Sequence, residues 1–251
     1  MGKRNTVEFV VYGRRALFSD PITRVGGEKF SYQIPTYEAL RGILESVYWK
    51  PTFIWYVDKV RVMNKIQTES LGMRPIKYND ARSNELSYYT YLKDVRYQVR
   101  AHFEWNMNES REQLAHDRDE HKHHNIAKRM IKRGGRRDIF LGTRECQGYV
   151  EPCKFGNGES AYDGWGELDF GVMFHGFDYP DDTGEDKLWS RLWRPVMRDG
   201  IISFLMPEEC PKELRRFIKP MKPKLFEDKI NFSGLEEEEL LRILAERCED
   251  E

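Results

Sequence analysis

The chain has 251 residues and a mass of 29.9 kDa, enough for one large domain or two small ones with a sizeable core. Apolar residues make up 39% of the sequence and aromatic residues 13%, which excludes disorder along the whole chain although 33% of the residues are charged. The formal net charge of -1 argues against a protein that is basic throughout.

Two strands and a helix are predicted in the first part of the chain. Apolar residues alternate over residues 7–12, which indicates a strand. Thr36 can cap a helix whose apolar face recurs at helical spacing over residues 40–48, and Pro51 stops that helix. Residues 53–63 are rich in β-branched and aromatic side chains and therefore predict a second strand.

The clearest strand pattern runs from Tyr91 to Trp105, where apolar and polar residues alternate. A helix follows and ends at Gly134-Gly135, because glycine takes the left-handed conformation that terminates helices. Residues 139–142 supply a fourth strand. The order strand, helix, strand, strand, helix, strand is that of a ferredoxin-like domain, an arrangement shared by RNA-recognition domains.

The remainder of the chain has a different composition, rich in glycine and aromatic residues. A smaller antiparallel β-rich unit is predicted over residues 146–216, in which Asp199-Gly200 marks a two-residue hairpin. Residues 217–251 are predicted to form a linker and an acidic C-terminal helix. The predicted fold class is α+β, with a ferredoxin-like (RRM-like) domain over residues 1–145 followed by the β-rich unit.

Membrane proteins and disulfide-rich secreted proteins are not expected. No apolar run approaches the ~18 residues that span a bilayer, and the first residues do not resemble a signal peptide. The four cysteines are too few and too irregularly spaced for a disulfide framework. We therefore expect a soluble, cytoplasmic protein.

Charge is distributed unevenly along the sequence. Residues 121–144 contain eight basic residues against one acid, Asp138, whereas residues 227–251 contain ten acids against three basic residues. This polarity predicts a basic surface for a polyanion, although solvated helix faces of opposite sign are an alternative interpretation. The candidate RNA-binding residues are Lys128, Arg129, Lys132, Arg133, Gly134, Gly135, Arg136 and Arg137.

Histidines concentrate in the same region, with the densest group at residues 121–124. One interpretation is an exposed polar helix start. A metal site is another, but no regular ligand spacing links these histidines to the acids at residues 117–120, so no metal is expected. The third interpretation is metal-free RNA cleavage, in which a 2′-hydroxyl attacks the adjacent phosphate.

That reaction needs a group that titrates near neutral pH and a cation that stabilises the developing charge on the phosphate. His123 and Lys122 are residues of these two types. Tyr48 is the last residue of the apolar face of the first predicted helix, and this spacing is typical of a core aromatic residue. The alternative is that its phenol positions the attacking hydroxyl or the phosphate. Spacing alone does not decide between these roles.

Three segments together resemble one known family: GGEKFSYQIPTYEALRGILESVYWKPT, SYYTYLKDVRYQVRAHFEW and HKHHNIAKRMIKRGGRRDIFLGTREC. The sequence is similar to the pre-crRNA-processing subunit of the Cascade-type complex in type I-C CRISPR systems, from the N-terminus to about Arg216. The resemblance implies a metal-independent endoribonuclease with no cofactor. It also implies a catalytic Tyr, Lys and His set that falls on Tyr48, Lys122 and His123.

The resemblance implies partners as well. These are pre-crRNA and the mature crRNA, and the backbone and large subunits of the complex. Contact with target DNA is a further possibility. His121 and His124 flank the candidate pair where relatives tend to have glycine and an aromatic residue, so either histidine is an alternative proton carrier. Two other functions stay open: a non-catalytic scaffold that caps the 5′ end of the guide RNA, and a general RNA-binding protein.

Overall fold

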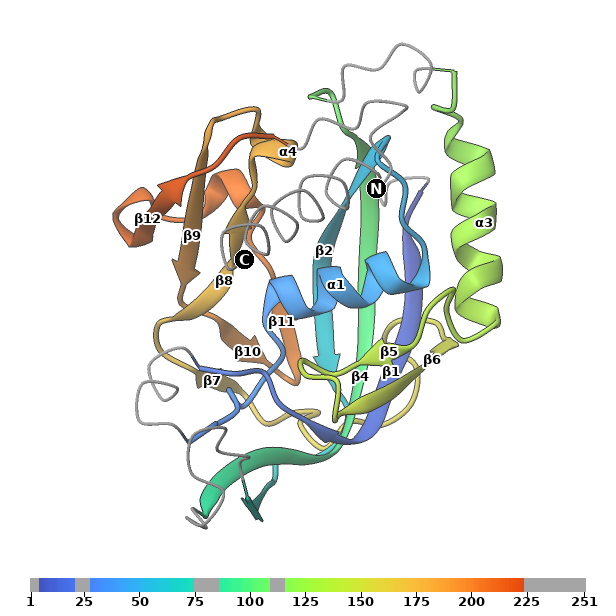
Figure 1. Cartoon of the computed structure of the whole chain (residues 1–251). Coiled ribbons are helices and arrows are strands. Elements are labelled where there is room, and N and C mark those ends of the chain that lie inside the picture. The colour runs from blue at the N-terminus through green and yellow to red at the C-terminus, as the bar shows by residue number, and fades with distance from the viewer. Residues whose placement is uncertain (1–4, 21–27, 75–85, 109–115, 224–251) are drawn as a thin grey trace, which may run out of the picture.

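The computed structural model describes residues 5–20, 28–74, 86–108 and 116–223 (Figure 1). The predicted acidic C-terminal helix lies outside these described residues. The helices are α1 (Tyr37–Val47), α3 (Glu120–Lys132) and the short α4 (Pro180–Thr183). The strands are β1 (Val7–Ala16), β2 (Phe53–Val62), β3 (Thr68–Met73), β4 (Ser87–Trp105), β5 (Ile139–Phe140), β6 (Gln147–Pro152), β7 (Glu167–Asp169), β8 (Met173–Asp178), β9 (Lys187–Trp193), β10 (Val196–Arg198), β11 (Ile201–Ser203) and β12 (Arg215–Pro220).

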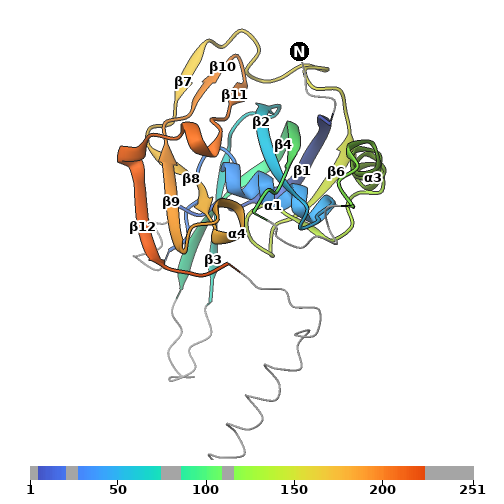
Figure 2. The same ribbon diagram turned by 90° about the horizontal axis from the view of Figure 1, so that it is seen from above.

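Antiparallel β-sheet dominates the described structure. The larger sheet has nine strands in the order β5-β6-β1-β4-β2-β11-β10-β7, with β3 paired to β4 as a branch. The smaller sheet has the order β12-β9-β8. In Figures 1 and 2, α1 crosses one face of the central strands and α3 stands beside β6 at the other end of the sheet from β7. None of the helices in these described ranges has the length and apolar content needed to cross a bilayer.

The predicted helix after Thr36 is confirmed, and its local sequence explains its position. The Thr36 side chain accepts a hydrogen bond from the amide of Ala39 at 3.1 Å, which caps the first turn. The side chains at the predicted apolar spacing are buried and pack on the sheet. The helix ends at Val47, before Pro51, because the chain turns to an extended conformation at Tyr48.

The longest strand, β4, pairs with three neighbours. Its second half lies between β1 and β2, and its first half pairs with β3. Asp94 marks the change, since its φ of 49° is rare for a residue with a side chain and bends the strand. The hairpin of β3 and early β4 therefore projects from the rest of the molecule (Figure 2).

The predicted alternation in β4 is confirmed on one face and incomplete on the other. Val99, Ala101 and Phe103 are buried as expected, but the polar Gln98 and His102 on the opposite face are also buried. The Gln98 amide donates to the carbonyl of Asn157 at 2.6 Å and accepts from the amide of Gly156. The chain after β6 therefore covers a face that the pattern predicts to be solvated.

The strands after residue 145 are distributed between the two sheets. Asp199 and Gly200 have φ values of 46° and 78° and join β10 to β11, which confirms the predicted two-residue hairpin. That hairpin extends the larger sheet through the pairing of β11 with β2. Part of the segment predicted as a linker from residue 217 is instead strand β12, paired with β9. The boundary between residues 145 and 146 stays a prediction.

A buried group of charged side chains connects α1 to the smaller sheet. The guanidinium of Arg41 lies 2.6 Å from the carboxylate of Asp182, and Arg191 is hydrogen-bonded to the carboxylate of Asp178. Glu38 accepts a hydrogen bond from the amide of Phe177 at 3.3 Å. Because these groups are largely removed from water, each depends on its partners, and together they fix α1 against β8 and β9.

Candidate active site

The structure places Tyr48 at the C-terminal end of α1, with its ring in the core. Its side chain is almost fully buried and packs against Phe53, and its carbonyl accepts a hydrogen bond from the indole of Trp55 at 2.7 Å. The two interpretations of this residue are therefore not exclusive. Tyr48 is a core aromatic, and its hydroxyl oxygen lies 2.8 Å from Nδ1 of His123.

The first turn of α3 positions Lys122 and His123 on different sides of the helix. Asp119 is the N-cap, and its carboxylate accepts a hydrogen bond from the amide of Lys122 at 3.0 Å. The side chain of Lys122 is 52% exposed, whereas that of His123 is fully buried. Since adjacent residues on a helix point about 100° apart, one helix turn presents a cation to solvent and an imidazole to the core.

Both ring nitrogens of His123 have partners. Nε2 lies 2.5 Å from the backbone carbonyl oxygen of Asp117, and Nδ1 faces the hydroxyl of Tyr48. A carbonyl oxygen can only accept, so Nε2 carries the proton. In the neutral ring Nδ1 is then the acceptor, and the Tyr48 hydroxyl donates to it. This arrangement directs the basic nitrogen of His123 toward the phenol.

Aromatic rings enclose the imidazole on its other sides. The rings of Phe53, Phe103 and Trp105 have their centroids between 5.4 and 6.4 Å from that of His123. These contacts come from the ends of β2 and β4, so the sheet and both helices meet at this residue. His123 therefore has no direct exposure to a ligand in this conformation.

Asp117 brings the charged groups of the site together. One oxygen of its carboxylate lies 2.5 Å from Nζ of Lys122, and the other lies 3.9 Å from Nζ of Lys50 and 3.6 Å from Nε2 of His123. Its side chain is 19% exposed. One carboxylate thus faces two lysines and the imidazole.

These contacts shift the ionisation of the site. Burial, and then the negative charge of Asp117, raise the pKa of Tyr48, while the guanidinium of Arg136 opposes them. Partial burial would raise the pKa of Asp117, but the hydrogen bond from Lys122 and the nearby positive groups lower it overall. The same hydrogen bond raises the pKa of Lys122. At neutral pH the phenol is protonated and the Asp117-Lys122 pair is ionised.

The two flanking histidines lie apart from this group. His121 is exposed on the first turn of α3. Nε2 of His124 lies 3.0 Å from the backbone carbonyl of Thr6, ahead of β1. The structure therefore brings together Tyr48, His123 and Lys122, with Asp117 between the last two.

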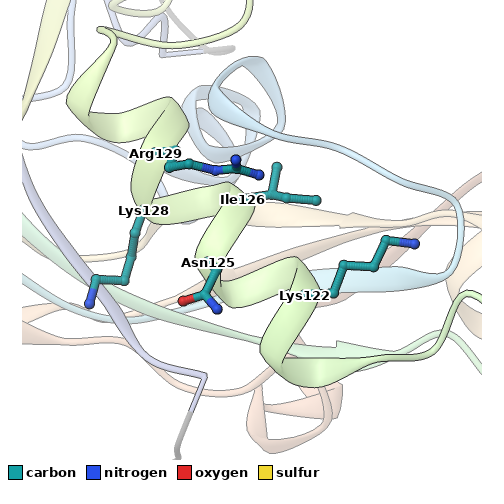
Figure 3. A pocket seen from close by; sticks show the side chains of 5 residues that line it. All are labelled: Lys122, Asn125, Ile126, Lys128 and Arg129. Atoms are coloured by element: carbon teal, nitrogen blue, oxygen red, sulfur yellow. The ribbon is translucent and has the colours of Figure 1, made fainter.

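The basic residues of α3 form an exposed surface beyond the site. Lys128, Arg129, Lys132 and Arg133 are exposed, on the side of the helix away from the buried Ala127 and Ile131. A shallow hollow of about 670 Å³ lies on this helix and is lined by Lys122, Asn125, Ile126, Lys128 and Arg129. Figure 3 shows these five side chains. In that view the side chains of Lys122, Ile126 and Arg129 point the same way, as residues four and three apart on a helix do.

The loop after α3 connects this surface to the end of α1. The amides of Gly134 and Gly135 donate to the carbonyls of Ile131 and Met130, which terminates α3. The amides of Arg136 and Arg137 donate to the carbonyl of Ser46 at 3.2 and 3.0 Å. The two glycine amides are therefore engaged within the protein. Both arginine side chains are exposed, and the charge of Arg136 opposes the burial that raises the pKa of Tyr48.

Two residues of the site were missed by sequence reasoning. Asp117 was considered only as an unsuitable metal ligand, and Lys50 was not considered. The available signal was proximity: Lys50 follows Tyr48 by two residues, and Asp117 precedes the helix N-cap by two. Among the described residues, no group of three or more histidine, cysteine, aspartate or glutamate side chains is arranged to hold a metal ion.

Comparison with known proteins shows the family of this chain. The sequence matches the Cas5d family model, described as "CRISPR-associated protein (Cas_Cas5)", over residues 6–205. The chain belongs to the Cas5d family. It is 32% identical over 189 residues to a Cas5d from Thermus thermophilus that is named a CRISPR pre-crRNA endoribonuclease, covering 71% of this chain and 76% of that protein.

Further relatives support the same Cas5d assignment. A protein of the same name from Mannheimia succiniciproducens is 34% identical over 82 residues, which is 33% of this chain and 31% of that one. A crystal structure of a CRISPR-associated protein has a TM-score of 0.67 at 40% identity, covering 82% of this chain and 94% of the other. A functionally uncharacterized protein from Streptococcus mutans has the same TM-score and coverage at 42% identity.

Proposed function

We propose that this protein is a metal-independent endoribonuclease that cleaves CRISPR repeat RNA and then stays on the 5′ end of the guide. The observation that supports this most strongly is the 2.8 Å contact between the Tyr48 hydroxyl and His123, beside the ammonium of Lys122. Tyr48 thus lies near two residues that follow it by 74 and 75 positions, and the set includes the titratable group and the cation that metal-free RNA cleavage needs. Relatives named pre-crRNA endoribonucleases point to the same substrate.

The proposed reaction is an internal transfer at one phosphodiester. The 2′ oxygen attacks the adjacent phosphorus, the bond from phosphorus to the 5′ oxygen breaks, and the products carry a 2′,3′-cyclic phosphate and a 5′-hydroxyl. The proton lost by the 2′-hydroxyl is balanced by one that the leaving 5′ oxygen gains from solvent. No step needs a metal ion or a cofactor.

The side chains have distinct proposed roles. Tyr48 positions the 2′-hydroxyl and passes its proton inward, because its own proton is already directed at Nδ1 of His123. His123 is the proton acceptor. Lys122 stabilises the negative charge that develops on the phosphate oxygens. His124 is less suited to this role than His123, since its Nε2 is directed at a backbone carbonyl.

We further infer that the exposed cations of α3 and the following loop hold flanking phosphates of the RNA. This surface comprises Lys128, Arg129, Lys132, Arg133, Arg136 and Arg137. Gly134 and Gly135 lie within it, but their amides donate to carbonyls of α3, so the proposed phosphate contacts come from the side chains. We also propose a ferredoxin-like core for the RNA-binding part of the chain, and the strand order β6-β1-β4-β2 with α1 and α3 supports this proposal. Backbone and large subunits of the complex, and target DNA, are the expected further partners in the cytoplasm.

A non-catalytic scaffold is the alternative function, and one assay separates the two. The purified protein is incubated with repeat RNA in EDTA, beside Tyr48→Phe and His123→Gln variants. We expect wild-type cleavage in the chelator and a rate lower by about 100-fold or more in each variant. Binding of the repeat without cleavage by the wild-type protein would establish the scaffold instead.

A further inference from the structure

The carboxylate of Asp117 occupies a place suited to a phosphate. It accepts a hydrogen bond from Lys122 at 2.5 Å and faces Nζ of Lys50 at 3.9 Å. A carboxylate and the two non-bridging oxygens of a phosphodiester present similar acceptors to such cations. Lys50 lies in the loop after α1 and Lys122 in the first turn of α3, while Asp117 lies just before α3.

Asp117 and Tyr48 both lie against the imidazole of His123. One carboxylate oxygen of Asp117 is 3.6 Å from Nε2, and the Tyr48 hydroxyl is 2.8 Å from Nδ1. The imidazole therefore lies between the position that Asp117 fills and the phenol proposed to hold the attacking hydroxyl. This part of the argument rests on the proposed function.

An RNA phosphate bound at Lys122 and Lys50 would lie against the Asp117 carboxylate, and two anions at close range repel each other. We therefore expect the carboxylate to move away from the lysines when RNA binds. The backbone carbonyl of the same residue accepts a hydrogen bond from Nε2 of the buried His123, so this segment of chain connects the two lysines to the imidazole.

We propose that Asp117 holds the place of the scissile phosphate in the RNA-free protein, and that Lys50 is the second cation that contacts this phosphate when RNA replaces the carboxylate. Lys50 is 43% exposed and therefore accessible to RNA. In the free protein the carboxylate keeps both ammonium groups near the place that the phosphate takes. RNA binding then exchanges one anion for another.

Binding is measured in a Tyr48→Phe background, so that the intact repeat RNA can be used whether or not the wild-type protein cleaves it. We expect Asp117→Asn to bind fluorescently labelled repeat RNA about two- to fivefold more tightly, because a competing anion is removed. Glu120→Gln is the matched control, since it removes one negative charge from the first turn of α3. Equal or weaker binding by Asp117→Asn, or equal tightening by Glu120→Gln, would overturn the exchange.

The role of Lys50 is tested by the rate of RNA cleavage at saturating RNA, in protein that retains Tyr48. We expect Lys50→Met to lower that rate about tenfold or more, and Lys50→Arg to restore most of it. In the binding assay Lys50→Met should reduce the slope of log affinity against log salt by about 0.7. An unchanged rate and an unchanged slope would remove Lys50 from the site. Failure of the wild-type protein to cleave would refute the proposed function and leave the Asp117 exchange to be judged by the binding arm alone.

Discussion

Tyr48 shows how a single side chain serves the core and the candidate site. Its ring packs with Phe53, and its hydroxyl donates to the buried His123. The sequence predicts the ring's burial from helical spacing, and the family resemblance nominates the hydroxyl. Neither predicts the contact with His123, because it depends on how α1 and α3 pack across the sheet.

The hydroxyl of Tyr48 can be tested apart from its ring. Tyr48→Phe retains the packing but leaves Nδ1 of His123 without its donor in the core. We expect a loss of about 1–2 kcal/mol in the free energy of unfolding, measured by urea denaturation. Unchanged stability would mean that the hydrogen bond is not formed in solution.

The ionisation of Asp117 makes the stability of the folded protein depend on pH. Its pKa in the folded protein is lowered, although partial burial opposes this, because Lys122 and neighbouring positive groups stabilise the carboxylate. The pair therefore contributes stability that is fully present above the ordinary aspartate pKa of about 3.9, and that is lost as the pH falls through the lower folded value.

The variant Asp117→Asn lacks that titration. We expect its melting temperature to fall less steeply than that of the wild-type protein as the pH is lowered from about 5 to about 3. Asp138→Asn, at an exposed position beyond α3, is the control and should follow the wild-type curve. Parallel curves for Asp117→Asn and the wild-type protein would show that the pair does not form.

At the scale of elements, local sequence predicts where the helices and central strands lie. It does not predict the tertiary hydrogen bonds at their ends or the pairing of the later strands. The cap at Thr36 and the hairpin at Asp199-Gly200 are encoded by neighbouring residues and were predicted correctly. The stop before Pro51 was also predicted, but not the amides of Arg136 and Arg137, far along the chain, that donate to the last carbonyls of α1. Strand β12 was missed for the same reason, since its pairing with β9 is a tertiary contact.

The helix α1 carries Tyr48 and depends on its N-terminal cap. Thr36→Ala removes the acceptor for the Ala39 amide, and we expect a loss of about 1 kcal/mol in the free energy of unfolding. Thr36→Ser retains the hydroxyl and should lose much less. If both variants are equally destabilised, the hydroxyl does not cap the helix.

At the scale of the whole molecule, buried charge holds the smaller sheet to the helix that ends at the site. The side chain of Arg191 is 3% exposed, bonds to the carboxylate of Asp178 and donates to Nδ1 of His175. Burial, followed by the charge of Arg191, lowers the pKa of His175 to about 3, so this histidine is neutral. Sequence patterns give no sign of this group, because its members lie on separate elements.

Removing one charged side chain of this buried group leaves the others buried without an opposite charge or a hydrogen-bond partner. We expect Arg191→Ala to lower the free energy of unfolding by about 3–5 kcal/mol. Arg198→Ala, which removes an exposed ion pair with Glu167, should change it by about 0.5 kcal/mol or less. Equal effects of the two substitutions in urea denaturation would show that the buried group does not stabilise the fold.

The central claim is that the RNA's own 2′-hydroxyl is the nucleophile at a site built from Tyr48, His123 and Lys122. The most direct measurement is cleavage, in EDTA, of repeat RNA that carries one deoxyribonucleotide immediately upstream of the mapped break. The account predicts that this substrate binds normally and resists cleavage, while the unmodified repeat yields a 2′,3′-cyclic phosphate and a 5′-hydroxyl. Cleavage of the deoxy-substituted repeat at the same position and rate would contradict it.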